Sequence, residues 1–137
     1  MNPVCIAIIS NENSPLLMQT STAYKSSELD LMFLAHSSLD VIEEKLTVRS
    51  TGVDQRELYL GQLYPTEQYK IYGYVTNSKI KILVMTENTS QNIDQEVKTL
   101  FKQLHRSYAQ LMYNPFYQPG DKIHFPSFVK YIEDILK

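Results

Sequence analysis

The sequence predicts a mixed α+β fold of three layers, α/β/α, with its elements in the order ββαβββαα. Short runs of β-branched and aromatic residues predict five strands, and three longer segments repeat apolar residues at helical spacing. The first strand segment, residues 4–10, is apolar on both faces. Because such a strand needs cover on both sides, we expect a five-stranded antiparallel sheet with one helix on one face and two on the other.

The opening segments predict a hairpin followed by a long helix. Residues 16–20 return as a second strand after the turn at 11–15. Ser27 precedes the helix, and a right-handed crossover places that helix on one face of the sheet. The side that faces the sheet is predicted from a stripe at helical spacing, formed by Leu29, Met32, Phe33, His36, Leu39, Ile42 and Leu46. We expect His36 to be a buried, hydrogen-bonded histidine.

The middle of the chain predicts a three-stranded meander. Residues 57–64 form its first strand, and a hairpin with its turn at Asn77-Ser78 supplies the other two. Asn tolerates the positive φ that a two-residue loop requires. This turn predicts a register in which Val75 pairs with Ile80 and Tyr74 pairs with Lys81.

Two further helices are expected after the meander. The first carries a stripe formed by Val97, Leu100, Phe101, Leu104, Tyr108, Leu111 and Met112. It ends at Asn114-Pro115-Phe116, which resembles a peptide-docking motif but is expected to stop the helix. The last helix starts near Pro126 and is expected to bury Phe128, Ile132 and Ile135, with Tyr131 as a further candidate.

Composition excludes several classes of function. The 13 basic and 15 acidic residues provide no electrostatic footprint for nucleic acid or an anionic membrane. The apolar runs are too short to span a bilayer, so no direct membrane insertion is expected. A single cysteine, Cys5, excludes an internal disulfide and a structural zinc site, and a central strand makes it an inert buried thiol.

Residue chemistry predicts no enzyme. The three histidines have no partners at metal-ligand spacing, and four scattered glycines form no phosphate-binding loop. We therefore expect no catalytic residues, no metal and no cofactor. Ten tyrosines suit protein interfaces, although they equally suit the faces of a sheet.

Four stretches resemble the sedlin-like small subunits of the TRAPP vesicle-tethering complex. They are "VCIAIIS", "HSSLDVIEEK", "DQRELYLGQLYPTEQYKIYGYVTNSK" and "NPFYQPGDKI". The third is long and specific, and it is most similar to the subunit 2-like branch of that family. The resemblance implies one longin-like (SNARE-like) domain over residues 1–137.

The resemblance also implies a function. Such a subunit is a non-enzymatic adaptor that helps assemble the TRAPP complex in ER-to-Golgi and Golgi vesicle trafficking. Its partners are other TRAPP subunits and, indirectly, a Rab-family GTPase whose nucleotide exchange the complex supports. It is expected in the cytoplasm, held peripherally at Golgi and ER-Golgi membranes through the complex. A homodimer in crystals is a further partner to consider. The alternative functions are a longin domain that regulates SNARE or other trafficking partners, a small-ligand-binding module, and an enzyme of unrecorded type.

Three residues of the first helix are candidates for protein binding. The resemblance aligns Asp40 with the aspartate of the "LD" pair in sedlin-like proteins, although Asp40 could equally be structural, bonding backbone or a cation. Leu31 and Val41 lie off the predicted inward stripe, so we expect them beside Asp40 on the outer surface. Exposed apolar groups rimmed by charge often mark protein contacts.

Overall fold

The computed structural model describes residues 3–10, 12, 14–21, 26–49, 58–63, 68–76, 80–87, 93–116, 123 and 126–136. The helices and strands follow one another as β1 (Pro3–Ile9), β2 (Pro15–Thr20), α1 (Glu28–Arg49), β3 (Leu58–Gln62), β4 (Tyr69–Val75), β5 (Lys81–Glu87), α2 (Asp94–Met112) and α3 (Pro126–Leu136).

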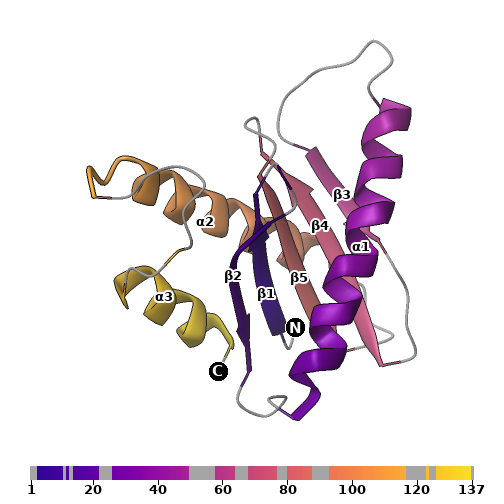
Figure 1. Cartoon of the computed structure of the whole chain (residues 1–137), viewed down its shortest axis with the longest axis horizontal. Helices are drawn as coiled ribbons and strands as arrows, with labels where there is room; N and C mark the ends of the chain where they lie inside the picture. Colours follow the sequence, from indigo (N-terminus) through magenta and orange to yellow (C-terminus); the bar gives the residue numbers. More distant parts are fainter. Residues whose placement is uncertain are drawn as a thin grey trace.

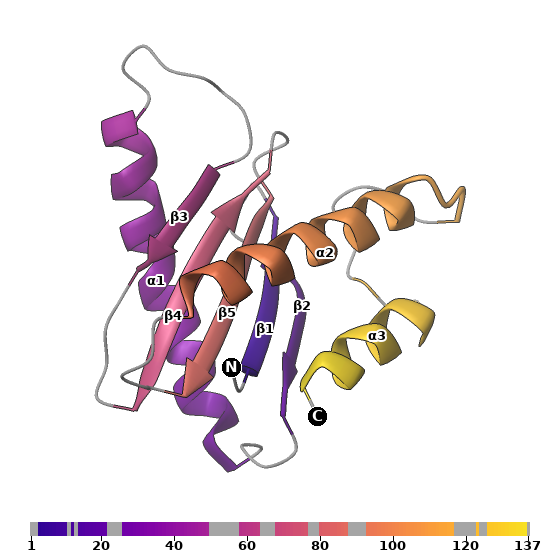
Figure 2. The same ribbon diagram turned by 180° about the vertical axis from the view of Figure 1, so that it is seen from behind.

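The strands form one antiparallel sheet in the order β2-β1-β5-β4-β3. β1 and β5 are therefore interior strands, and α1 connects the β2 edge to the β3 edge. Figure 1 shows α1 crossing one face of the sheet, and Figure 2 shows α2 crossing the opposite face, with α3 beside β2. The predicted mixed α+β class with an antiparallel sheet and three helices is confirmed.

Two hydrophobic cores lie on the two faces of the sheet. Ile6 and Ile8 of β1 belong to the core that α2 and α3 cover, whereas Cys5 and Ala7 belong to the core that α1 covers. Successive residues of a strand point to opposite faces. β1 is thus apolar at consecutive positions because each face packs against helices.

The register of the β4–β5 hairpin differs by one residue from the prediction. Tyr74 pairs with Ile82 and Val75 pairs with Lys81. The hairpin closes at Thr76, whose N–H donates to the carbonyl of Ile80 over 2.9 Å. The loop is therefore longer than the predicted two residues, and a shift of one residue exchanges the partners on both faces of a sheet.

α1 packs with a different side against the sheet than its spacing predicts. Its buried residues are Leu31, Ala35, Ser38, Leu39 and Ile42. Of the predicted stripe, Leu39 and Ile42 are buried, but Leu29 is 81% exposed and Phe33 is 72% exposed. His36 is also exposed, and the side chain of Leu46 lies outside the described part of the chain.

The side of α1 that faces the sheet includes two small residues that the predicted stripe did not contain. The first turns of α1 carry apolar side chains on several sides, so helical spacing alone does not define which side faces the sheet. Ala35 and Ser38 are buried on the side of α1 that faces the sheet, and the Ser38 hydroxyl donates to the Leu34 carbonyl over 2.8 Å. That bond satisfies the buried hydroxyl.

The inward sides of α2 and α3 are as predicted. In α2 the predicted stripe is buried from Val97 to Leu111, with Met112 partly buried. α3 begins at Pro126 and buries Phe128 and Ile132. Polar residues occupy the other side of these two helices, so their apolar pattern has only one interpretation.

Candidate protein-docking site

No catalytic cluster occurs among the residues that the structure describes. Groups of three or more His, Cys, Asp or Glu side chains that could hold a metal ion are absent from this part of the chain. His105 lies against the ring of Tyr74, with ring centroids 5.9 Å apart. His124 lies outside the described residues.

The thiol of Cys5 is inert. Burial raises its pKa from 9.0 to about 12, and the nearby charge of Glu28 also raises it, whereas a hydrogen bond from Thr20 Oγ1, 3.9 Å from Sγ, lowers it. Because the thiolate is the nucleophile, this thiol is unreactive at neutral pH. The predicted burial of Cys5 is confirmed.

The outer surface of α1 carries an apolar patch. Leu29 and Phe33 are mostly exposed, and Met32 is 38% exposed. These residues lie within about one helical turn of one another, because positions three and four apart share a helix face. We call Leu29, Met32 and Phe33 the α1 apolar patch.

The candidate residues occupy different sides of α1. Asp40 is exposed, and its spacing of seven from Phe33 places it on the same side as the α1 apolar patch. Leu31 is 0% exposed, so its predicted place on the outer surface is wrong. Val41 is partly buried and packs against the core beneath α1, which also contradicts the prediction.

The sequence contained a signal for the missed patch residues. Residues 29–34 include five large apolar side chains, more than one side of a helix can bury. Some of them had to lie outside. The buried small residues Ala35 and Ser38, which the predicted stripe did not include, mark the inward side, and the apolar residues on the other side are exposed.

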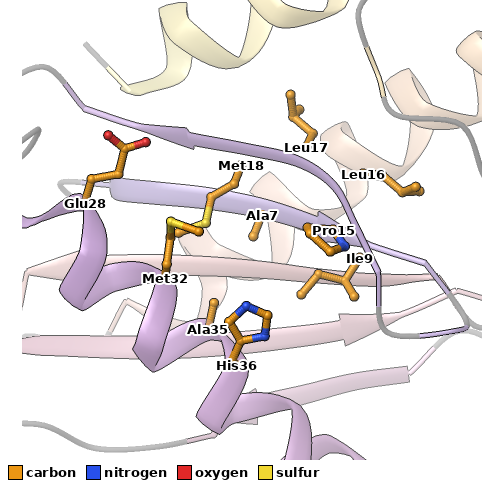
Figure 3. A pocket seen from close by; sticks show the side chains of 10 residues that line it. All are labelled: Ala7, Ile9, Pro15, Leu16, Leu17, Met18, Glu28, Met32, Ala35 and His36. Carbon is orange, nitrogen blue, oxygen red and sulfur yellow. The ribbon is translucent and has the colours of Figure 1, made fainter.

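A groove of about 290 Å³ adjoins the α1 apolar patch. Figure 3 shows it between α1 and the β1–β2 hairpin, with Met32 and His36 on the helix side and Met18 and Pro15 on the strand side. Its remaining lining residues are Ala7, Ile9, Leu16, Leu17, Glu28 and Ala35. Met32 belongs to both the groove and the patch, so the two form one continuous apolar surface.

Acidic side chains flank this surface at both ends. Residues 28–44 contain no Lys or Arg, and their acidic residues are Glu28, Asp30, Asp40, Glu43 and Glu44. Glu43 Oε1 lies 2.7 Å from Nζ of Lys81, whose side chain is 3% exposed, so this pair joins α1 to β5. The outward side of α1 is therefore apolar near its start and acidic beyond it.

A pair of exposed aromatic side chains lies at the end of α2. Tyr113 and Phe116 are both exposed, and the Phe116 N–H donates to Oδ1 of Asn114 over 2.9 Å. This Asn side chain closes a turn directly after the helix. The expectation that Asn114 and Pro115 end the helix is confirmed.

The fold and these surfaces define a class of protein. An antiparallel sheet carries helices on both faces, the described residues lack a metal cluster, and an apolar–acidic helix surface faces outward. This is a mixed α+β protein with an exposed apolar surface of the kind that protein contacts use. None of the described helices has the length and apolarity that crossing a membrane requires.

The chain belongs to the Sedlin family, whose family model matches residues 8–137. Trafficking protein particle complex subunit 2-like protein of Taeniopygia guttata is 48% identical over 127 residues, covering 91% of this chain and 90% of that protein. The Mus musculus protein of the same name has the same identity and coverage. Its namesake in Dictyostelium discoideum is 37% identical over 138 residues, covering 97% of this chain and 95% of that protein.

Proposed function

We propose that this chain is a non-enzymatic adaptor subunit of the TRAPP complex, acting in ER-to-Golgi and Golgi vesicle trafficking. The names of its relatives support this proposal, because they are subunits of the trafficking protein particle complex. Its direct partners are other TRAPP subunits. It supports nucleotide exchange on a Rab-family GTPase only indirectly, by helping to assemble the complex.

The outward side of α1 carries this proposal. Asp40 and the α1 apolar patch lie on the same side of the helix, and none of them is needed to fill the core beneath α1. Exposed apolar residues flanked by charge are typical of protein contacts. We place the subunit contact there rather than on Leu31 and Val41.

The proposal extends to domain organisation and location. Residues 1–137 form one longin-like domain, and the chain resides in the cytoplasm, held at Golgi and ER-Golgi membranes through the complex. A small-ligand carrier would need a closed cavity, whereas the groove beside α1 is partly open. An open groove favours a docking role.

Affinity purification tests the proposal. Asp40→Tyr should reduce co-purification of TRAPP subunits from cells at least about tenfold, while thermal unfolding stays within about 2 °C of wild type, because Asp40 is exposed. Glu133→Tyr, at an exposed acidic position on α3, is the matched control and should retain the subunits. Equal recovery with both variants, or loss of folding in Asp40→Tyr, would contradict the assignment.

A further inference from the structure

We propose that the outward side of α1 and the adjoining groove bind an amphipathic helix of a partner protein, with apolar anchors in its centre and Lys or Arg at both ends. This inference rests on the proposed function and specifies the partner chemistry of the same surface. Three properties of the described residues lead to it: apolar exposure, charge and the state of the neighbouring sheet edge.

Apolar exposure defines the centre of the contact. Leu29 and Phe33 are the most exposed members of the α1 apolar patch, and Met32 belongs to both the patch and the lining of the groove. At about 290 Å³ the groove lies just below the roughly 300–1,000 Å³ typical of small-molecule pockets. It therefore suits one or two side chains of a partner, inserted between Met32 and Met18.

Charge defines the ends of the contact. Glu28 lies just before the patch in the sequence, Asp30 lies within it, and Asp40 and Glu44 follow it. Residues 28–44 contain no Lys or Arg. A partner with acidic ends would be repelled there, and one with Lys or Arg at both ends would be attracted. Leu29 and Asp40 are eleven residues apart, which is about 16 Å along a helix, or three turns.

The β2 edge disfavours an extended strand as the occupant. An added strand needs a row of free backbone donors and acceptors. Here Pro15 has no N–H, the Leu16 carbonyl accepts from the Ile123 N–H over 2.9 Å, and Thr20 is 5% exposed. These blocked positions disfavour strand addition, and a partner that binds through side chains, as a helix laid into a groove does, fits this surface better.

A model peptide tests the partner chemistry directly. The probe is a fluorescein-labelled peptide of about 14 residues, composed of leucine and lysine with the leucines on one helical side. We expect saturable binding to the full chain by anisotropy, with NMR shifts confined to residues 15–18 and 28–44. A leucine–glutamate peptide of the same pattern should not bind, and raising salt from about 50 to about 300 mM should weaken the lysine peptide.

Matched variants locate the site. Phe33→Ser should weaken binding of the lysine peptide at least about tenfold. Phe116→Ser removes another mostly exposed phenylalanine, far from α1 in the sequence, and should leave affinity within about twofold. No saturable binding, equal binding of the glutamate peptide, or equal affinity of both variants would overturn the inference.

Sedimentation distinguishes a second copy of the chain from a helix of another protein. A wild-type dimer that Phe33→Ser converts to monomer would overturn the inference, because the patch would then be a homodimer contact. If the lysine peptide binds this surface but the wild-type chain recovers no TRAPP subunits, the proposed function fails and the docking surface stands. If Asp40→Tyr loses the subunits but the peptide does not bind, the inference fails alone.

Discussion

The orientation of α1 makes opposite predictions for two leucines that are two positions apart. Leu31 is 0% exposed and packs in the core beneath the helix, whereas Leu29 is 81% exposed. Residues two apart on an α-helix are about 200° apart around its axis. The substitutions Leu31→Ala and Leu29→Ala remove the same atoms from the same helix, so they differ almost solely in environment.

The expected magnitudes follow from burial. Truncating a buried leucine to alanine costs about 2–5 kcal/mol, through lost burial and the cavity left behind, and we expect about 3 kcal/mol for Leu31→Ala. Truncating an exposed leucine changes stability by at most about 0.5 kcal/mol, and alanine favours the helix slightly. Leu31→Ala should therefore lower Tm by about 10 °C, and Leu29→Ala by less than about 2 °C.

Urea unfolding followed by circular dichroism measures the difference. With a slope of about 2 kcal/mol/M, Leu31→Ala should lower the midpoint by about 1.5 M, while Leu29→Ala leaves it nearly unchanged. Equal losses, or a larger loss for Leu29→Ala, would refute the orientation of α1. The docking surface would then lose its support, because Leu29 and Phe33 would belong to the core.

Two further predictions concern buried groups. Glu43→Gln should destabilise the fold by about 1–2 kcal/mol, because the buried Lys81 ammonium loses a carboxylate that is itself 54% exposed and partly hydrated. In a Lys81→Met background the same substitution should cost less. Equal costs in the two backgrounds of this double-mutant cycle would contradict the coupling. The pKa of Cys5 is about 12 in the folded state against 9.0 ordinarily, so the unfolded thiol releases its proton first as pH rises, and the free energy of unfolding falls by about 1.4 kcal/mol between pH 7 and pH 10. In Cys5→Ala the fall in the free energy of unfolding over this range should be smaller by that amount. An identical pH dependence of the two proteins would speak against burial of the thiol.

Local patterns in the sequence determine much of this fold. The two-sided apolar run of β1 requires helices on both faces, and the composition of the described cores agrees. In α2 and α3, one side is apolar and the other polar, so periodicity alone identifies the inward residues. The inert character of Cys5 follows similarly, because a thiol in an apolar interior strand is desolvated.

Tertiary packing decided two features that local sequence patterns left open, and the docking surface depends on the second. The closure of the β4–β5 hairpin at Thr76 set its register, because one extra loop residue exchanges the faces of a strand. The inward side of α1 includes the small residues Ala35 and Ser38, which the helical spacing of large apolar residues does not reveal. A helix with apolar residues all round satisfies helical spacing in more than one orientation. Only its contact with the sheet selects Leu31 for the core and leaves Phe33 for a partner.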